Sequence, residues 1–460
     1  MRTTSKRLAV PTPPRTPGAP VGPALAVPRP AANALEGSSF VEGARKASAK
    51  DAAQTVRSPK DAVHFIEDFN QALGLSGKDL SGKNEKLVEG EFGFFRGMPA
   101  LFNADVKGPF AQASVLFDRP SPQGLLDGDP HLSNFGTLRG PDGQPVWGLN
   151  DFDQSGTGPL EWDLERLATS AVLAARANGL APEAQAQLVR DVAQGYFSTL
   201  DAYAQTGARP APVLSARDAA GPVRAQLDDA GSATQEALLK PLTHTNKDGE
   251  LRFKGKGLDP VEKKDKKALS AALASYAAAL PANAPVAQPL QVLDLATESG
   301  KGGSSYGLQR YLALVADADP SKPPHVLELK QEMPSAVADG TGDLSHADAA
   351  VDVAHQATLS GFLDPLVGSV PLEDGSYLVR ELQPEGLGTK TDGMDFAALD
   401  SLASQAGEAL ARAHAQSVDP QSVRTWLGDD QKAATDNLLA FAETYAHQTE
   451  ADLRAFKKSL

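Results

Sequence analysis

The sequence predicts an α+β protein with two lobes. Between residues 58 and 204, apolar residues recur at the three- and four-residue spacing of amphipathic helices. Between residues 289 and 331 the period changes to two, which is typical of β-strands. We therefore expect four parts in chain order: a Pro- and Ala-rich basic arm and linker at 1–57, a helical lobe with the candidate site loops at 58–285, a small β lobe at 286–385, and C-terminal helices that pack on the helical lobe at 386–460.

The arm differs from the rest of the chain in composition and charge. Residues 1–32 contain eight prolines together with Ala and Gly, a composition that cannot bury enough apolar surface to become ordered. Residues 1–60 hold ten basic and three acidic side chains, so they contribute +7 to the total of −14 and the remaining residues carry −21. Because the residues after 60 carry this much negative charge, they would repel phosphates, which argues against a nucleic acid as the main partner. We expect the arm to be a solvated tail, and contact with an anionic surface is the alternative.

Two features of the sequence bear on chemistry and location, although the absence of Cys does not by itself fix the compartment. The chain contains no Cys, which excludes disulfides, thiolate catalysis and Cys-ligated zinc. No apolar run approaches the length of a membrane span, and the first ten residues lack the apolar region of a signal peptide. We therefore expect a cytoplasmic protein with no membrane partner.

Two short polar segments follow apolar runs in the helical lobe. The first reads DGDPHLSN at 127–134, and the second reads NDFD at 150–153. Phosphoryl transfer needs a carboxylate that accepts the proton of the attacking hydroxyl, and an amide and a second carboxylate that hold Mg²⁺ against the phosphates. Asp129, Asn134 and Asp151 supply these groups, and oxygens are the ligands that Mg²⁺ prefers. Asp, Asn and Gly also favour tight turns, so a pair of turns without chemistry is the alternative.

These segments, with GTGPLEWDLERLA at 156–168, resemble the catalytic and metal-binding loops of aminoglycoside and choline kinases. More closely, the stretch from Phe94 to Ala168 resembles the bacterial domain-of-unknown-function family 2252, which is grouped with the protein-kinase-like superfamily. Later blocks are similar too, so the resemblance covers roughly residues 60–460. It implies a protein-kinase-like fold of two lobes.

The resemblance also implies roles for individual residues. Asp129 matches the catalytic base, and His131 matches a His that orients the catalytic loop. Asn134 and Asp151 match the metal ligands. Asp163 matches an Asp that supports the catalytic loop from the following helix.

Two positions depart from the kinase pattern. Asp127 stands before Gly128, where those kinases carry His. Asp153 adds a second carboxylate two positions after Asp151, and residues two apart in a strand face the same side. We therefore expect Asp153 to assist Asp151 at the metal, and which of the two dominates stays open.

A Gly-rich loop at 298–307 joins two predicted strands of the β lobe, and a third strand at 325–332 carries Lys330. Backbone N–H groups of such a loop can approach phosphates closely, and a Lys on a neighbouring strand can reach them. An ordinary hairpin is the alternative. The expected phosphate contacts come from Gly300, Gly302, Gly303, Ser304 and Lys330.

The segments after Lys330 fit a nucleotide site only in part. In kinases a Glu on the next helix pairs with the strand Lys, but the predicted helix at 346–363 contains no Glu. Asp348, Asp352 and Gln356 lie four apart on one helix face and are the candidate partners. The segment 376–383 resembles the strand and hinge beside which adenine sits.

The order of the segments departs from that of kinases, in which the Gly-rich loop and the Lys precede the catalytic Asp. Here they follow Asp129 by more than 150 residues. LARAH at 410–414, which resembles a segment just before the catalytic loop of small-molecule kinases, comes later still. We therefore expect a circularly permuted kinase fold, since permutation costs little when native termini are close and exposed. Segments 289–383 and 124–153 should then face each other across one cleft.

The expected function is transfer of a phosphoryl group from ATP, with Mg²⁺, to a hydroxyl of an unknown small molecule or protein. Transfer of AMP to a protein side chain is one alternative, and nucleotide binding without catalysis in a regulatory module is another. Arg96, in FFRG at 94–97, either contacts a phosphate or pairs with a carboxylate, and we expect the ion pair.

Overall fold

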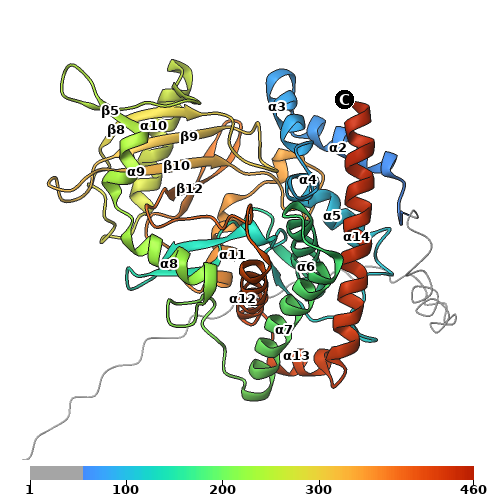
Figure 1. Ribbon diagram of the computed structural model, residues 1–460. Helices are drawn as coiled ribbons and strands as arrows, with labels where there is room; N and C mark the ends of the chain where they lie inside the picture. The colour runs from blue at the N-terminus through green and yellow to red at the C-terminus, as the bar shows by residue number, and fades with distance from the viewer. Residues whose placement is uncertain (1–54) are drawn as a thin grey trace, which may run out of the picture. The chain divides into compact units, whose positions relative to one another are not determined.

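The computed structural model describes residues 55–460, which form the expected α+β protein (Figure 1). The arm and linker predicted at 1–57 therefore fall almost entirely outside the described residues. Ser58 begins the first described helix, because its hydroxyl accepts a hydrogen bond from Lys60 N and Pro59 fits the first turn. The first four helices are α2 (Pro59–Ala72), α3 (Gly77–Leu87), α4 (Glu91–Gly97) and α5 (Pro99–Lys107).

Two small sheets carry the polar segments. In the first sheet, β1 (Gln123–Leu126) pairs antiparallel with β4 (Gly156–Pro159). In the second, β2 (Phe135–Arg139) pairs with β3 (Pro145–Leu149). The DGDPHLSN segment thus lies between β1 and β2, where it ends in the short helix η1 (Leu132–Asn134), and the NDFD segment lies between β3 and β4.

Five of the described helices contribute most of the main core of the protein. They are α6 (Leu160–Ala177), α7 (Pro182–Thr206), α12 (Phe396–His414), α13 (Pro420–Leu427) and α14 (Gln431–Ser459). Two glycines let α7 and α12 approach closely. A Cβ at Gly195 would lie 2.1 Å from Ser404 O, and a Cβ at Gly407 would lie 2.2 Å from Val192 O. This crossing fixes where the end of α12 meets the polar loops.

The second lobe is built on a six-stranded antiparallel sheet with the order β11-β12-β10-β9-β8-β7. The three strands predicted from the two-residue period correspond to β8, β9 and β10. The strands are β7 (Leu258–Pro260), β8 (Val292–Glu298), β9 (Arg310–Val315), β10 (His325–Gln331), β11 (Gly368–Leu372) and β12 (Gly375–Glu381).

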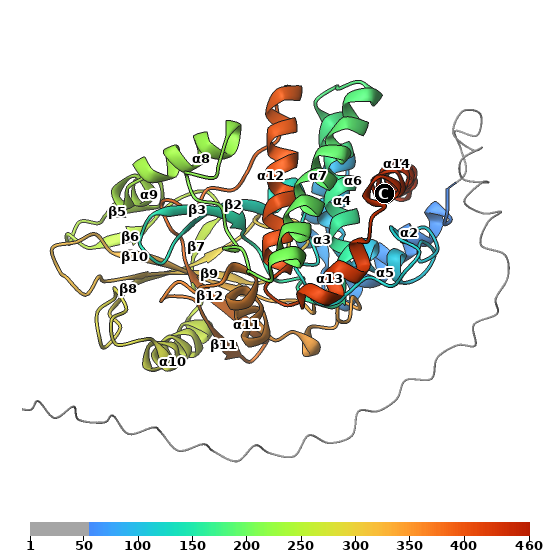
Figure 2. The ribbon, with the colours of Figure 1, turned by 90° about the horizontal axis from the view of Figure 1, so that it is seen from below.

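Helices lie on both faces of this sheet, with α10 on one side and α9 on the other (Figure 2). Leu273 and Tyr276 of α10 pack on Leu327 and Leu329 of β10, whereas Leu239 of α9 packs on Val326 of the opposite strand face. α8 (Gly221–Ser232) packs on the main core through Val223 and Leu227. The remaining described elements are α9 (Gln235–Leu242), β5 (Thr243–Thr245), β6 (Leu251–Phe253), α10 (Lys263–Ala279), η2 (Leu344–His346) and α11 (Ala349–Ser360).

The sequence assigned residues 58–285 to the helical lobe, but the structure groups the last part of that range with the sheet. β7 pairs with β8, and α10 packs on the sheet. The Ala- and Lys-rich sequence of α10 shows that it forms a helix, but it does not show which core the helix covers.

The start of the described chain is fastened to its last helix. Arg57 is buried between two carboxylates: its Nε lies 2.6 Å from Asp105 Oδ1, and its Nη2 lies 2.7 Å from Asp452 Oδ2. Its backbone N–H donates to the Gln448 side chain, whose amide donates back to the Arg57 carbonyl. α2 and the C-terminus therefore lie side by side, as both ribbon views show.

Candidate active site

The turn after β1 is held from behind by Asp163, in the first turn of α6. One Asp163 carboxylate oxygen accepts a hydrogen bond from Asp127 N at 2.7 Å, and the other accepts one from Gly128 N at 3.0 Å. His414 Nε2 lies 3.1 Å from this carboxylate, and His414 Nδ1 lies 2.8 Å from the Tyr196 hydroxyl. Asp163 thus contacts the loop as the resemblance implies, and the end of α12 lies directly behind it.

Gly128 brings the two polar loops together. Its φ is +83°, and a Cβ here would lie 2.0 Å from Gln154 O, in the loop between β3 and β4. Any other residue would be strained and would push that loop away.

Asp129 is buried beside a fully buried arginine. Arg166 Nε donates to Asp129 Oδ1 at 2.7 Å, and Arg166 Nη2 lies 2.5 Å from the same oxygen. Burial raises the pKa of Asp129 to about 7, although the charge of Arg166 opposes the rise. A carboxyl that titrates near neutral pH is suited to take up and release a proton there.

His131, the second predicted catalytic residue, is also buried. Its Nε2 lies 3.8 Å from Asp129 Oδ2, which is too far for a hydrogen bond. Burial and the nearby Arg96 and Arg166 charges hold the pKa of His131 well below its usual range, so the ring is neutral. The ring meets Phe92 edge to face, with centroids 6.2 Å apart. These contacts suit a residue that shapes the loop.

Asn134 joins the two loops. Its amide nitrogen donates to Asp151 O at 3.2 Å and to Asp127 Oδ2 at 3.4 Å. Asp127 Oδ1 is buried and has no hydrogen-bond partner among the described residues. Burial, with Asp163 and Asp129 close by, raises the pKa of Asp127 well above its usual range. The site therefore contains a buried carboxylate oxygen that no hydrogen-bond donor of the described residues reaches.

Lys330, from β10 of the sheet lobe, ends among carboxylates of the NDFD loop. Its Nζ donates to Asp153 Oδ2 at 2.7 Å and to Asp151 Oδ1 at 3.2 Å, and lies 3.7 Å from Glu332 Oε2. The Asp153 side chain is 7% exposed, whereas the Asp151 side chain is 37% exposed. Segments 289–383 and 124–153 thus meet, and Asp151 is the carboxylate that faces the opening.

The charges in this cluster are unbalanced. Burial alone would raise the pKa of Asp151, but Lys330 and Arg380 outweigh it and lower that pKa. Glu332 is less compensated: burial raises its pKa to about 8, and neither carboxylate oxygen has a hydrogen-bond partner within residues 55–460. Burial likewise raises the pKa of Asp352 to about 9. Burial therefore favours the protonated forms of Glu332 and Asp352.

The predicted partners of Lys330 on the helix at 346–363 make no ion pair with it in the described chain. Asp348 caps α11, where its carboxylate accepts a hydrogen bond from Ala350 N. Asp352 faces the cluster but contributes only at longer range, and Gln356 lines the neighbouring hollow. The direct partners are Asp153, Asp151 and Glu332, because the NDFD loop approaches β10 more closely than α11 does.

The donor set fits a divalent cation. No group of three or more His, Cys, Asp or Glu side chains within the described range is placed to hold a metal. Mg²⁺ needs fewer protein ligands than that, since it keeps waters and shares substrate phosphates beside one or two carboxylates. Asp151 and the Asn134 amide oxygen would hold it, with Asp153 assisting, and the buried oxygens of Asp127 and Glu332 that lack hydrogen-bond partners are further acceptors nearby.

The Gly-rich loop between β8 and β9 is held by two lysines of α3. Lys83 Nζ donates to Ser304 O at 2.8 Å, and Lys86 Nζ donates to Gly302 O at 3.0 Å and to Gly300 O at 3.2 Å. Positive φ values at Gly300 (+76°) and Gly302 (+91°) shape the loop. Gly303 lies between these contacts. The loop leads into β9, which neighbours β10, the strand that carries Lys330.

Arg96 does not form the expected ion pair with any described residue. Its exposed guanidinium lies over the Phe92 ring, 5.5 Å from the ring centroid. Asp129, the predicted catalytic base, is already paired with Arg166.

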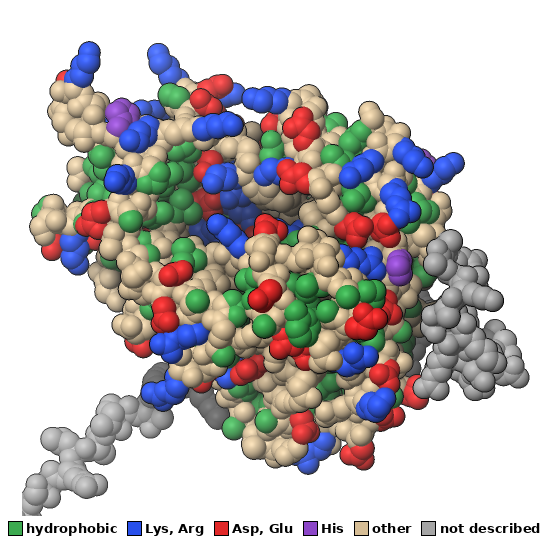
Figure 3. Space-filling model, viewed as in Figure 1, with side chains coloured by type: hydrophobic (Ala, Val, Ile, Leu, Met, Phe, Trp, Pro, Cys, Tyr) green, Lys and Arg blue, Asp and Glu red, His purple; other side chains and the backbone are tan. Residues whose placement is uncertain are grey.

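The cleft between the lobes is hollowed on the face drawn in Figure 3, where Lys and Arg side chains gather between the sheet and helices α3 and α4. A hollow of about 270 Å³ beside the hinge is lined by Leu382 and Gln383, from the segment where adenine was expected. It shares Asn150, Gln356 and Arg380 with the small hollow at Asp151.

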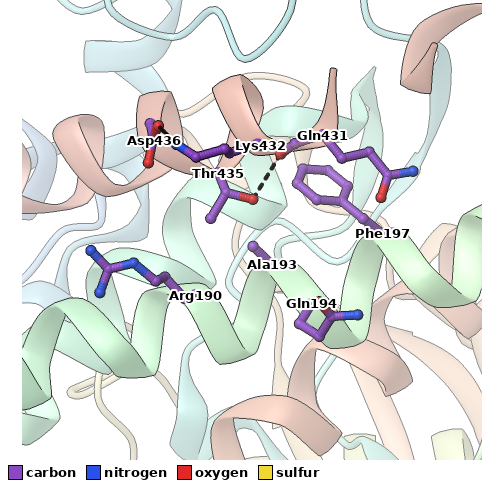
Figure 4. A pocket seen from close by; sticks show the side chains of 8 residues that line it. All are labelled: Arg190, Ala193, Gln194, Phe197, Gln431, Lys432, Thr435 and Asp436. Atoms are coloured by element: carbon purple, nitrogen blue, oxygen red, sulfur yellow. Dashed lines mark hydrogen bonds and ion pairs between the residues drawn. The ribbon is translucent and has the colours of Figure 1, made fainter. Parts of the chain in front are cut away.

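A larger hollow, of about 490 Å³, lies elsewhere, between α7 and the start of α14 (Figure 4). Arg190, Lys432 and Asp436 line it together with Gln194, Gln431 and Thr435. It is open, its charged groups sit on the helix surface, and it brings together none of the residues described above.

Several residues of the site were not predicted from the sequence. Glu332 could have been found, because it lies two positions after Lys330 in an alternating strand and so shares its face. Arg166 lies three positions after Asp163, on the same side of α6. Lys83 and Lys86 give no such signal, because their partners lie more than 200 residues away.

Within residues 55–460, no helix combines the length and the apolar character that crossing a membrane requires. The comparison with curated proteins found no match. The comparison with solved structures found none either. One family model does match, over residues 78–459, and it contains every site residue named above. The chain therefore belongs to the bacterial family described as "Uncharacterized protein conserved in bacteria (DUF2252)".

Proposed function

We propose that this protein is an ATP- and Mg²⁺-dependent phosphotransferase with a kinase-like, circularly permuted arrangement of its two lobes. The observation that carries the proposal is the contact of Lys330 with Asp151 and Asp153. A strand lysine that follows a Gly-rich loop, placed against the Asp of a metal-binding loop, is the arrangement that grips nucleotide phosphates in kinases. ATP as donor also places the reaction in the cytoplasm.

The residues divide the chemistry between them. The acceptor hydroxyl oxygen forms a bond to the γ-phosphorus of ATP while the bond from that phosphorus to the ADP oxygen breaks. Asp129 takes the hydroxyl proton, for which a pKa of about 7 suits it. Mg²⁺, when bound by Asn134 and Asp151, neutralises charge on the phosphates. Lys330 can then turn from Asp151 toward phosphate, while Asp153 keeps it in place.

Binding of Mg·ATP to the full chain tests this function. Calorimetry should show Mg²⁺-dependent ATP binding that Asp151→Asn weakens by about tenfold or more, as expected for a lost charged contact. Asp436→Asn, in the hollow of Figure 4, is the matched control and should bind normally. Absence of Mg·ATP binding to the wild-type chain would overturn the proposal.

Product mass then distinguishes the reaction from its alternatives. Labelled ATP is incubated with the protein and a panel of hydroxyl compounds. A product heavier by one phosphate supports phosphoryl transfer, whereas a gain of one AMP means nucleotidyl transfer. Mg·ATP binding without any turnover across the panel and on the protein itself would indicate a regulatory module.

A further inference from the structure

Arg96 is an unsatisfied cation at the edge of the site. It lies in the last turn of α4, its side chain is exposed, and it forms no ion pair with any described residue. Phe92, one turn earlier, lies beneath its guanidinium at 5.5 Å and limits where the group can point. An arginine supported in this way loses little freedom when it binds an oxyanion, and its planar fork can bind one with two hydrogen bonds.

Two chains of contacts connect Arg96 to the proposed base. Phe92 packs edge to face on His131, whose Nε2 lies 3.8 Å from Asp129. Arg166, which binds Asp129, also donates to Phe95 O, in the residue directly before Arg96. Arg96 is therefore placed on the side of the site where the acceptor hydroxyl must lie.

A different set of cations serves the nucleotide side. Arg310 and Arg380 both pair with Glu328, on the strand face that carries Lys330, and their charges act on Asp151. Arg96 acts instead on Asp129 and His131. The division suggests two anions in the cleft, one at Lys330 and one at Arg96.

Charges of both signs surround Arg96. The carboxylates Asp129 and Asp392 act on it directly. Three cations, Arg96, Lys301 and Arg310, act on Lys86 of α3, although they come from α4, the Gly-rich loop and β9. They gather on a body whose net charge is strongly negative, and Figure 3 shows such side chains inside the central hollow. A locally positive cleft on an acidic protein concentrates anions there.

We propose that the acceptor carries an oxyanion, a phosphate or a carboxylate, near its reacting hydroxyl, and that Arg96 binds this group. The proposal rests on the proposed function for the identity of the reaction, because it assigns the acceptor of the same site. It excludes acceptors with a cationic group at this position, such as amino sugars, because the Arg96 guanidinium would repel that group. Arg96 is a specificity-determining residue on this account, and Asp129 remains the base.

Three probes of similar shape test the charge requirement: glycerol 3-phosphate, glycerate and glycerol, each titrated into the full chain with Mg·ADP bound. The first two separate phosphate from carboxylate, and glycerol has no charge. At least one anionic probe should bind, and Arg96→Gln should weaken it by about tenfold or more, as for a lost charge-assisted hydrogen bond. Arg96→Lys should restore part of the affinity, because it keeps the charge but not the fork.

Arg190→Gln is the matched control, because Arg190 is an exposed arginine in the separate hollow of Figure 4. Equal weakening by Arg190→Gln would mean nonspecific attraction and would overturn the inference. So would unchanged binding in Arg96→Gln, glycerol binding as tight as that of the anions, or no binding of either anion. Mg·ATP affinity is measured separately. If Arg96→Gln lowers it as much as it lowers anion binding, Arg96 serves the nucleotide and the inference fails.

The two proposals fail in different ways. A chain that binds Mg·ATP but no anionic probe keeps the phosphotransferase proposal and loses the anionic acceptor. A chain that shows Arg96-dependent anion binding but no Mg·ATP binding keeps the oxyanion site and loses the phosphotransferase.

Discussion

Glu328 of β10 and Glu332, which directly follows that strand, lie in opposite electrostatic surroundings. Burial would raise the pKa of Glu328, yet Arg380 and Arg310 lower it to about 2. Burial raises the pKa of Glu332 from 4.5 to about 8, because Lys330 and Arg380 oppose the rise only in part and Asp153 and Asp151 add to it. Glu328 therefore stabilises the fold at all pH values above about 4.5, whereas Glu332 favours the folded state while protonated and costs stability as the pH rises toward 8.

This contrast predicts how two matched variants respond to pH. Glu332→Gln should reduce the loss of unfolding free energy between pH 6 and pH 9, because the amide cannot ionise. Glu328→Gln should lower the unfolding free energy by a similar amount at both pH values, because two arginines lose their partner. Urea unfolding with a chelator present measures both. An unchanged pH dependence in Glu332→Gln would contradict the assignment of the titrating group.

Asp129 should control rate and not nucleotide affinity. Because its pKa is about 7, turnover by the wild-type protein should rise as the pH increases from 6 to 8. Asp129→Asn should lower turnover about 10²–10⁴-fold, the usual loss for a positioned base, and should remove that rise. Mg·ATP affinity should stay within a few-fold. If the variant melts early yet turns over at the wild-type rate when cold, Asp129 is a turn residue.

At the scale of elements, α3 and the Gly-rich loop form one unit. A Cβ at Gly82 of α3 would lie 2.2 Å from the Tyr306 hydroxyl, and Lys86 lies over the Tyr306 ring at 4.6 Å. Gly82→Ala should therefore displace Tyr306, loosen the loop and raise the Michaelis constant for Mg·ATP. Hydrogen exchange of loop amides, faster in the variant, measures the loosening.

Gly90→Ala is the control for that variant, because nothing lies within 4 Å of a Cβ at Gly90 and its φ of −179° suits any residue. Equal exchange rates in both variants would show that the contact with Tyr306 does not hold the loop.

The elements also show which parts of the fold and of the candidate site the sequence predicts. The strands β8, β9 and β10 were predicted because alternation is a local signal, and their ends fall within a few residues of the expected ones. That segments 289–383 and 124–153 meet was expected only because a resemblance supplied the arrangement. The contacts of Lys330 with Asp151 and Asp153, the free guanidinium of Arg96 and the lysine contacts of α3 depend on how distant segments approach, which no local pattern records.

At the scale of the whole molecule, the chain order of the lobes should not be essential. Asp452 contacts Arg57, and the eight residues after Asp452 extend α14 by only about 12 Å. A flexible linker of about eight Gly and Ser residues should join residue 460 to residue 55. A chain that opens between Ala208 and Arg209, in an exposed loop, would then place the sheet before the polar DGDPHLSN and NDFD segments.

We expect this rearranged chain to fold and to bind Mg·ATP as the natural order does. A thermal melt and calorimetry measure the two properties. Failure to fold, while residues 55–460 fold in their natural order, would show that the order of the lobes matters.

The buried Arg57 cluster places a sharp limit on shortening the chain from its beginning. A protein that starts at Thr55 keeps the guanidinium that Asp105 and Asp452 share. A protein that starts at Ser58 loses it and leaves two carboxylates buried without their cation, at a cost of about 3–5 kcal/mol. Three residues should thus separate a soluble, protease-resistant fragment from one that aggregates on expression. Equal melting temperatures for the two fragments would contradict this expectation. If the expectation holds, a stable fragment must begin at Thr55, which lies 23 residues before the start of the segment that matches the family.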